Sequence, residues 1–531
     1  MDTHPLRRFA ILLSVSSCIA GAVSAAESVQ AIVPDEATIS ELAQQMQRGA
    51  ISAHALAQHY LDRIAAVDKS GPAINAVIEL NPDALAVADK LDAERKRGKV
   101  RGPLHGIPVL IKDNIETADG MHTSAGSFAL AESAALRDST VAAKLRAAGA
   151  VILGKTNLSE WANFRSEHST SGWSGRGGQT KNPYVLDRNP CGSSSGTGAA
   201  IAANFAVVGI GTETDGSIVC PSSVNGLVGI KPTLGLVSRA GIVPIAHSQD
   251  TAGPMARTVT DAALLLGAIA GSDARDAASA AAKAHRADYA RSLDANALRG
   301  VRIGVVRKLA GFSPDVDMAF DRSIAALKAA GAIVVDPVEL PNQGKYDDDE
   351  NVVLQYEFKT DLNAYLAQLA PQVRVRTLAD LIAFDRDEAA REMPWFAQEI
   401  FEKSQARGPL SDQAYKDALA RSKALAGPQG IDAALQKEKL DVLVAPTGGP
   451  AWVNDLVNGD HYGGGSSSPA AVSGYPAVTV PMGIVHELPV GITFFGAAWS
   501  DARLIGYAYA FEQATRARRP PAFLQHVGAE P

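Results

Sequence analysis

The sequence predicts one large α/β/α domain, in which helices cover both faces of a mixed central sheet. Hydrophobic residues make up 46% of the 531, against 20% charged residues, so the chain has ample material for a large buried core. From residue 102 onward, short apolar runs typical of buried strands alternate with helical segments. Length alone would suggest several domains of roughly 150 residues, but no repeat or low-complexity linker divides the chain.

Charge and cysteine content argue against several classes of function. Lys and Arg number 50 against 57 Asp and Glu, a net charge of −7 with no dense basic run, so we expect no nucleic-acid partner. Three cysteines are too few for a disulfide framework and lack the spacing of zinc ligands. The cysteines therefore indicate no zinc site.

Residues 1–25 are predicted to be a signal peptide that is cleaved on export. Arg7 and Arg8 precede an uncharged apolar stretch over 9–22, and Val23-Ser24-Ala25 fits the small-x-small cleavage pattern. A membrane anchor is the weaker interpretation, because the run is shorter than the ~20 residues that span a bilayer. We expect a periplasmic or secreted protein, monomeric or homodimeric, without stable membrane insertion.

Cleavage would leave two cysteines, Cys191 and Cys220. It would remove Cys18, whose surroundings loosely resemble a lipoprotein box, just as the early arginine pair loosely resembles a twin-arginine signal. Export permits a disulfide, but nothing in the sequence requires one. We expect both cysteines to be small buried thiols.

The predicted elements follow in order along the chain. Residues 26–100 form an N-terminal helical elaboration, with helices after a Thr38–Glu41 capping box, after Ser52, and from Asn81 to Gly98. Residues 101–531 carry the sheet. Strands are expected at Ile107–Ile111, Val151–Leu153, Ala206–Ile210, Ile333–Val335, Asp441–Val444 and Ala477–Val480, and helices at Ser139–Gly149, Ala199–Phe205 and within the charged stretch 272–426.

Two short matches to catalytic motifs stand in the wrong context. Residues 149–156 fit the phosphate-loop pattern, which needs a strand before the loop and a helix after it. Here a predicted helix precedes these residues, and their apolar centre is itself typical of a strand. Residues 192–196 fit the nucleophile elbow of α/β-hydrolases, but the preceding 181–190 are polar and contain two prolines instead of an apolar strand. We reject both interpretations.

Two Gly/Ser-rich loops, at 191–198 and 211–218, lie on either side of one predicted helix–strand unit. Their glycines would let backbone amides approach a reacting oxygen, although ordinary turns have the same composition. The surrounding sequence decides the matter. A recognisable pattern runs through segments 106–114, 154–157, 181–183, 192–194, 216–218 and 229–233, and it continues near the C-terminus at 474–481 and 488–491. Through these segments, residues 102–270 resemble the signature region of the amidase signature family of serine hydrolases.

The resemblance implies a Ser–cis-Ser–Lys triad made of Ser217, Ser193 and Lys112. Ser217 would be the nucleophile, Ser193 the bridge and Lys112 the general base, with an acyl-enzyme intermediate. It further implies an oxyanion hole of backbone amides from Thr214, Asp215, Gly216 and the nucleophile itself, and a supporting role for Ser194 beside the lysine.

A lysine acts as a base only when it is neutral. Its pKa in water is about 10.4, so work near pH 7–8 requires a drop of roughly 2–3 units. Burial at the end of the apolar run Ile107–Ile111 is a physical means to that drop.

Departures from the family pattern bear on the substrate. Many members carry Gly-Gly-Ser-Ile-Arg at the nucleophile, whereas Asp215 and Val219 here replace the first Gly and the Arg. Val219 cannot hold a carboxylate, which argues against a small acidic amide. The segments 159–165, 171–180 and 211–217 closely resemble the peptide amidase branch of the family, which removes ammonia from peptide C-terminal amides.

The sequence therefore predicts an exported amidase that hydrolyses carboxamides, with peptide C-terminal amides as the leading substrate. We expect this enzyme to need no metal and no other cofactor. A broad aliphatic or aryl amidase is the alternative within the class. A glutamine-amidase subunit fits the export signal less well, and a catalytically silent binding protein fits the intact triad less well.

Overall fold

The computed structural model describes residues 33–529 except 34 and 292. The described residues belong to one compact unit. The predicted signal peptide, residues 1–25, lies outside the described residues, as does the start of the predicted 26–100 segment. None of the described helices combines the length and the apolar character that a bilayer span requires.

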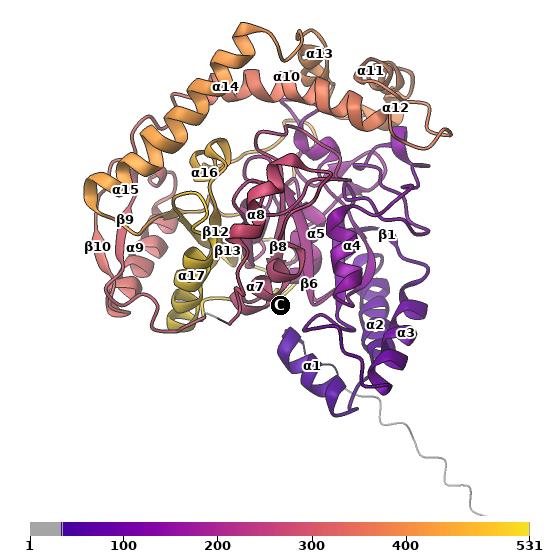
Figure 1. The fold of residues 1–531 in the computed structure, drawn as a ribbon, viewed down its shortest axis with the longest axis horizontal. Coiled ribbons are helices and arrows are strands. Elements are labelled where there is room, and N and C mark those ends of the chain that lie inside the picture. The colour runs from indigo at the N-terminus through magenta and orange to yellow at the C-terminus, as the bar shows by residue number, and fades with distance from the viewer. Residues whose placement is uncertain (1–32, 34, 292, 530–531) are drawn as a thin grey trace, which may run out of the picture. The chain divides into compact units, whose positions relative to one another are not determined.

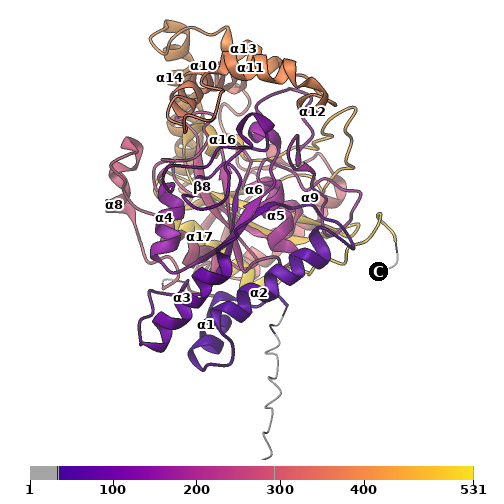
Figure 2. The same cartoon turned by 90° about the vertical axis from the view of Figure 1, so that its right-hand side faces the viewer.

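The central sheet is mixed and has 11 strands, in the order β1-β3-β2-β6-β8-β7-β12-β13-β11-β9-β10. Strand β2 runs parallel to β3 and to β6, and β9 runs parallel to β10 and β11, while the other neighbours are antiparallel. Helices flank the sheet: α4 packs against α7, α7 against α17 and α17 against α9, and α5 and α6 form a second group (Figures 1 and 2). The predicted α/β fold class is confirmed.

The strands of this sheet are β1 (Val77–Leu80), β2 (Pro108–Lys112), β3 (Val151–Thr156), β6 (Val208–Glu213), β7 (Val228–Lys231), β8 (Thr251–Ala256), β9 (Arg302–Val305), β10 (Ile333–Val335), β11 (Val442–Pro446), β12 (Ala477–Val485) and β13 (Leu488–Phe495). A separate hairpin pairs β4 (Trp173–Ser174) with β5 (Gly178–Gln179).

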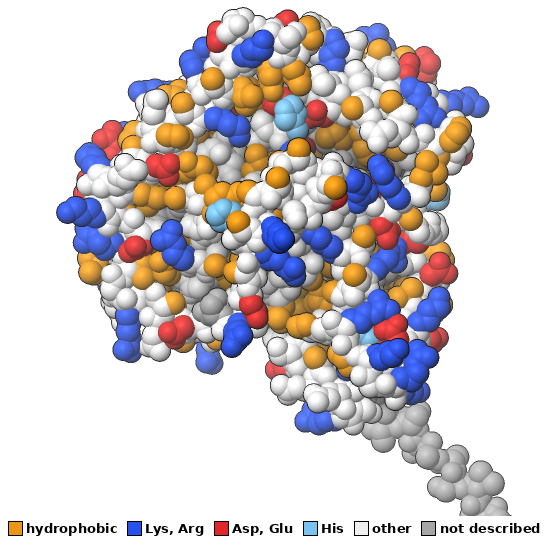
Figure 3. All heavy atoms as spheres, in the orientation of Figure 1, with side chains coloured by type: hydrophobic (Ala, Val, Ile, Leu, Met, Phe, Trp, Pro, Cys, Tyr) orange, Lys and Arg blue, Asp and Glu red, His pale blue; other side chains and the backbone are white. Residues whose placement is uncertain are grey.

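The α-helices of the described chain are α1 (Ile39–Gln47), α2 (Ala53–Arg63), α3 (Ala84–Lys96), α4 (Thr140–Ala147), α5 (Ser195–Ala202), α6 (Val219–Val224), α7 (Val259–Ile269), α8 (Ala282–His285), α9 (Pro314–Ala329), α10 (Asp347–Leu366), α11 (Leu378–Asp387), α12 (Ala389–Glu392), α13 (Glu399–Gln405), α14 (Gln413–Ala426), α15 (Ala433–Glu438), α16 (Ser468–Ser473) and α17 (Asp501–Thr515). Basic and acidic side chains are interspersed over the face drawn in Figure 3.

The N-terminal helices form where their capping residues predict. The Thr38 hydroxyl accepts from the Glu41 backbone N–H and the Glu41 carboxylate accepts from Thr38, the reciprocal capping box that starts α1. The Ser52 hydroxyl caps α2 in the same way through the Ala55 N–H. Beyond these helices, β1 joins the edge of the central sheet antiparallel to β3.

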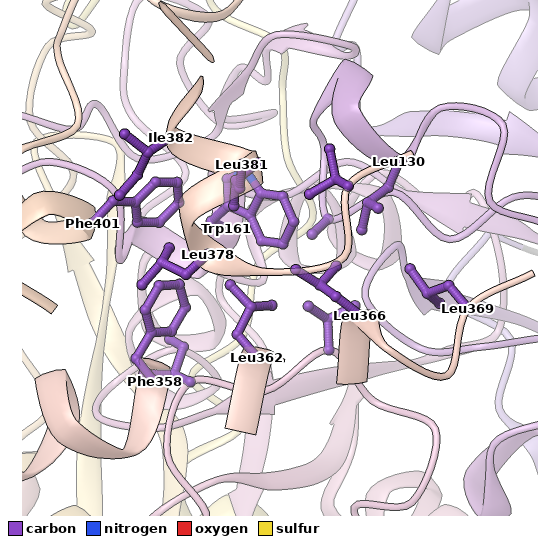
Figure 4. Packing of buried hydrophobic residues seen from close by; sticks show 14 of the residues in the cluster. Leu130, Trp161, Phe358, Leu362, Leu366, Leu369, Leu378, Leu381, Ile382 and Phe401 are labelled. Atoms are coloured by element: carbon purple, nitrogen blue, oxygen red, sulfur yellow. The ribbon is translucent and has the colours of Figure 1, made fainter. Parts of the chain in front are cut away.

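Helices α10, α11 and α13 lie together at the top of Figures 1 and 2 and share a hydrophobic cluster with Trp161, Leu130 and neighbouring residues (Figure 4). The Trp161 ring meets the Phe401 ring edge-on at 6.0 Å. Phe358 stacks on Phe401 at 5.3 Å. This packing fixes the helices over the signature region, because Trp161 belongs to that region and Phe358 and Phe401 belong to the helices.

Shortening one leucine of this cluster should destabilise the protein. Leu362 is fully buried at the centre of the cluster. Leu362→Ala is expected to lower the free energy of unfolding by about 2–5 kcal/mol, because it loses transfer energy and leaves a cavity. Urea denaturation measures the change. Leu136→Ala is the control, since Leu136 is 74% exposed and its truncation should change stability little; equal effects of the two variants would contradict the packing described.

Candidate functional site

The site is built where two parallel strands end side by side. Ile111 of β2 pairs with Ile210 of β6, so Lys112, the last residue of β2, lies beside the end of β6. All five residues of β2 are buried, and Lys112 is 0% exposed. Its Nζ donates to the hydroxyls of Ser193 at 2.7 Å and Thr212 at 2.9 Å, and to the Thr212 carbonyl at 3.3 Å.

Burial favours the neutral amine of Lys112. Loss of solvation lowers its pKa from about 10.5 to about 7, and the carboxylates of Asp250 and Glu213 only partly oppose the shift. No ion pair joins Lys112 to a carboxylate within the described chain. A lysine with this pKa is partly neutral at physiological pH and can accept a proton.

Ser193 and Ser194 come from the loop before α5. The Gly192–Ser193 peptide is cis, and the Ser193 hydroxyl receives the hydrogen bond from Lys112. The Ser194 hydroxyl donates to the Thr212 carbonyl at 3.0 Å and accepts from the Thr212 N–H at 3.1 Å, which ties this loop to the end of β6. Gly211 permits the approach, because a Cβ there would lie 2.7 Å from the Ser194 hydroxyl.

Ser217 lies in the turn between β6 and α6, next to the Ser193 loop. Its carbonyl accepts from the Ser194 N–H at 3.2 Å, so the two loops contact each other through the backbone. The hydroxyls of Ser193 and Ser217 are not hydrogen-bonded to each other among the described contacts. Gly216, at φ +79°, allows the tight turn that precedes Ser217.

The backbone amides around Ser217 lack hydrogen-bond partners in the described chain, although Thr214, Gly216 and Ser217 are buried and only Asp215 is partly exposed. Within the part of the chain that the structure describes, the N–H groups of residues 214–217 donate to no protein acceptor. Buried N–H groups normally have a partner, so this run of amides is available to an oxygen of a bound molecule. It coincides with the oxyanion hole expected at Thr214, Asp215, Gly216 and Ser217.

Two acidic side chains accept hydrogen bonds from the turn that carries Ser217. The Glu213 carboxylate accepts from the backbone N–H of Ile218 at 2.7 Å and of Val219 at 3.0 Å, immediately after the nucleophile candidate. Asp250 accepts from the Thr214 hydroxyl at 2.6 Å. Burial raises the pKa of Glu213, and it raises that of Asp250 to about 6. Both side chains thus fix the shape of the turn that carries Ser217.

Cys191 and Cys220 form a disulfide, so the expectation of buried thiols is wrong. Their Cα atoms are 6.1 Å apart although 29 positions separate them in sequence. The pairing arises from tertiary structure, because the loop before α5 and the start of α6 meet at the same end of the sheet. Cys191 stands two residues before Ser193, and Cys220 three residues after Ser217.

A cavity of about 590 Å³ opens onto this site. Ser193 and residues 212–214 lie in its wall, and segments 134–137, 239–245 and 364–370 supply most of the rest. Its volume lies within the range of small-molecule sites, roughly 300–1,000 Å³. The cavity therefore reaches Ser193 and Thr214, whereas Lys112, which is hydrogen-bonded to Ser193, and Ser217 are not among the residues that line it.

A second cluster consists of His247 and Asp361, which line the cavity, and the buried Glu357. His247 Nδ1 is 2.8 Å from Asp361, and its Nε2 is 3.4 Å from Glu357. These three side chains are placed closely enough to ligate a metal. The Tyr415 hydroxyl and the Ser248 N–H already donate to Glu357, however, and Asp361 accepts from the His247 N–H. The hydrogen bond from His247 to Asp361 raises the pKa of the imidazole.

The structure adds residues that the sequence did not single out. Thr212 accepts from Lys112 and from the Asn114 side chain at 3.0 Å, and it also binds Ser194. Asn114 lies in segment 106–114, which resembles the family pattern, and Thr212 lies in the Gly/Ser-rich loop 211–218. Their positions in these segments could have identified them as site residues. Asp250 lies in a segment without any pattern, and only the fold brings it to Thr214.

The chain is similar to known amidases along most of its length. A family model described as amidase matches residues 55–505. A probable amidase of Arabidopsis thaliana is 42% identical over 525 residues, which cover 97% of this chain and 96% of that protein.

Solved structures agree with this similarity. The native peptide amidase from Stenotrophomonas maltophilia superposes with a TM-score of 0.87 at 53% identity, covering 92% of this chain and 99% of that one. An amidase family protein from Bacillus anthracis has a TM-score of 0.83 at 37% identity, covering 91% of this chain and 92% of that one.

Proposed function

This chain belongs to the amidase family and is a hydrolase that acts on amides, and we propose that it removes ammonia from the C-terminal amide of peptides. The observation that carries the proposal is the buried Lys112 amine, hydrogen-bonded to Ser193 beside the loop of Ser217. Lys112, Ser193 and Ser217 act as base, bridge and nucleophile.

Acylation begins when neutral Lys112 takes the proton of the Ser193 hydroxyl while Ser193 takes that of Ser217. The Ser217 oxygen attacks the amide carbon, and the carbonyl electron pair moves onto the oxygen, which binds the free N–H groups of residues 214–217. The hydroxyls of Ser193 and Ser217 come within hydrogen-bond distance as substrate binds, since catalytic contacts often tighten in the complex.

Collapse of the tetrahedral intermediate breaks the carbon–nitrogen bond. Lys112 returns its proton through Ser193 to the departing nitrogen, which leaves as ammonia instead of as a poor anionic leaving group. Water then attacks the Ser217 ester and passes a proton through Ser193 to Lys112. The bond between the acyl carbon and the Ser217 oxygen breaks, that oxygen takes the proton back by the same route, and the carboxylic acid is released. Lys112 therefore serves as base and acid in turn, which a pKa of about 7 permits in both directions.

The substrate proposal has three supports. The solved structure with 53% identity is described as a peptide amidase. The cavity of about 590 Å³ has room for more than a small amide, and its walls include apolar side chains such as Ile242, Val243 and Leu369. Val219 is buried behind the turn and offers no charge to a small carboxylate substrate.

A substrate panel separates the alternatives. The protein is incubated with N-acylated dipeptide amides, simple aliphatic and aryl amides, and peptides with free C-termini, and ammonia and peptide products are measured. We expect ammonia from the peptide amides, with internal peptide bonds intact. Preferential hydrolysis of simple amides would favour the broad amidase, and hydrolysis of none would contradict the proposal in favour of a binding protein.

The charge of Asp250 should tune the pH dependence. Asp250 raises the pKa of Lys112, so Asp250→Asn removes a negative charge that stabilises the ammonium form. The rising limb of kcat/KM against pH is expected to move to lower pH than in the unsubstituted protein. Asp321→Asn is the control, because Asp321 is exposed and pairs with Arg307. An unchanged limb in Asp250→Asn would count against Lys112 as the titrating group.

We place the enzyme outside the cytoplasm on the pattern of residues 1–25, where peptide-sized substrates would reach it. Expression of the full chain should yield a mature protein that begins close to Ala26, as read by N-terminal sequencing of the exported fraction. Recovery of the uncleaved chain in the cytoplasmic fraction alone would contradict this.

A further inference from the structure

We propose that the Cys191–Cys220 disulfide is a positioning element of the active site, which holds the loop of Ser193 against the turn of Ser217 and thereby sets the rate of acylation. The proposal rests on the roles proposed for the two serines. In this proposal the disulfide affects the rate of the reaction in addition to stabilising the fold.

The disulfide joins the two catalytic segments close to their reacting residues. Cys191 precedes Ser193 by two residues in the loop that leads into α5, and Cys220 follows Ser217 by three residues in the first turn of α6. Cys191 is 5% exposed and Cys220 is 6% exposed, so the link lies inside the protein. A covalent bond thus spans the boundary across which the proton must pass.

The other contacts that link the two segments in the described chain are non-covalent: the Ser194 hydroxyl bonds the Thr212 backbone at 3.0 and 3.1 Å, and α5 packs against α6. The Ser194 N–H donates to the Ser217 carbonyl at 3.2 Å. The Asn225 side-chain amide donates to the carbonyls of Pro190 at 3.0 Å and Pro221 at 2.8 Å, and so bridges the same two segments a little further away. Gly192 and Gly216 precede the two serines and give the backbone freedom to move. We therefore expect the covalent bond to restrain the two segments beyond what these hydrogen bonds achieve.

The reaction is sensitive to the distance that this restraint controls. Proton transfer requires heavy atoms about 2.6–3.2 Å apart, and a displacement of about 1 Å can cost 10²-fold in rate. Most of the cavity wall comes instead from segments 134–137, 239–245 and 364–370, far from both cysteines in sequence. Loss of the disulfide should therefore lower kcat and leave KM nearly unchanged.

The test compares the unsubstituted protein with the Cys191→Ala/Cys220→Ala double variant, which leaves no reactive thiol at the site. Circular dichroism and a thermal melt identify a temperature at which both are folded. At that temperature kcat and KM are measured with an N-acylated dipeptide amide. The second-order rate of labelling by a fluorophosphonate, which reacts with an activated serine, is measured in parallel.

We expect kcat and the labelling rate to fall about tenfold or more in the folded double variant, with KM within twofold. A double variant with kcat and labelling within twofold of the unsubstituted protein would overturn the proposal, and so would a change confined to KM. A merely structural disulfide would lower the melting temperature without changing the kinetics of the folded protein.

A second measurement covers a double variant that does not fold. The unsubstituted protein is treated with a phosphine reductant, its free thiols are counted by mass spectrometry, and the labelling rate is followed during reduction and reoxidation. Labelling should fall as the disulfide opens and recover as it re-forms; a labelling rate independent of thiol content contradicts the proposal. Labelling without hydrolysis of any peptide amide would refute the proposed substrate and leave this inference standing on its own result.

Discussion

Ser217→Ala is expected to abolish ammonia release, with a loss in kcat on the order of 10⁶-fold, the scale seen when a serine hydrolase loses its nucleophile. Alanine removes the oxygen that forms the acyl-enzyme and leaves the fold intact, because no hydrogen bond of the Ser217 side chain is present among the described contacts. Ammonia assays and fluorophosphonate labelling both measure the loss.

Ser222→Ala is the matched control for that variant. Ser222 lies in α6, five residues after Ser217, and its buried hydroxyl has no hydrogen-bond partner in the described chain. Its loss should leave activity within a few-fold of the unsubstituted protein. Retention of substantial activity in Ser217→Ala would exclude Ser217 as the nucleophile, whatever the control shows.

Lys112→Met is expected to have the second-largest effect, a fall in kcat/KM on the order of 10⁴-fold. Methionine fits a buried site of this length but accepts no proton, so neither Ser193 nor Ser217 is activated. Lys112→Arg should be as inactive, because a guanidinium does not lose its proton in a protein. The initial rate of ammonia release at pH 8 measures both variants.

Lys155→Met provides a demanding control. Lys155 is also fully buried, on the neighbouring strand β3, and donates to the Ile115 carbonyl at 2.6 Å and the Thr123 hydroxyl at 2.9 Å. Its replacement should lower stability, because two acceptors lose their donor, while the folded fraction stays active. If folded Lys112→Met and folded Lys155→Met were equally inactive, the loss of activity could not be assigned to Lys112 as the base, and both lysines would have a structural role only.

The sequence predicted the strands that carry chemistry better than it predicted their limits. The apolar run before Lys112 identified β2, because a buried parallel strand is apolar on both faces. The expected strand over Ala206–Ile210 instead runs from Val208 to Glu213, since β8 pairs with its polar end through Thr251. The expected helix at Ala199 begins at Ser195, within what the composition suggested was loop.

What the sequence missed comes from pairings between distant segments. The edge strand β1 has only four residues, with no marked alternation, and is a strand because β3 pairs with it. The disulfide needs two loops to meet at one end of the sheet, which the spacing of Cys191 and Cys220 does not reveal. Asp250 likewise reaches Thr214 only through the β6–β8 pairing.

The pH dependence of kcat/KM tests most directly whether a neutral buried lysine drives the reaction, because this quantity reports the ionisation of the free enzyme. A peptide amide without ionisable groups is assayed between pH 5 and 10. Activity should rise with pH along one ionisation with an apparent pKa of about 7 and then reach a plateau, as Lys112 loses its proton. A profile that is flat across this range, or that rises only near pH 10, would contradict the account.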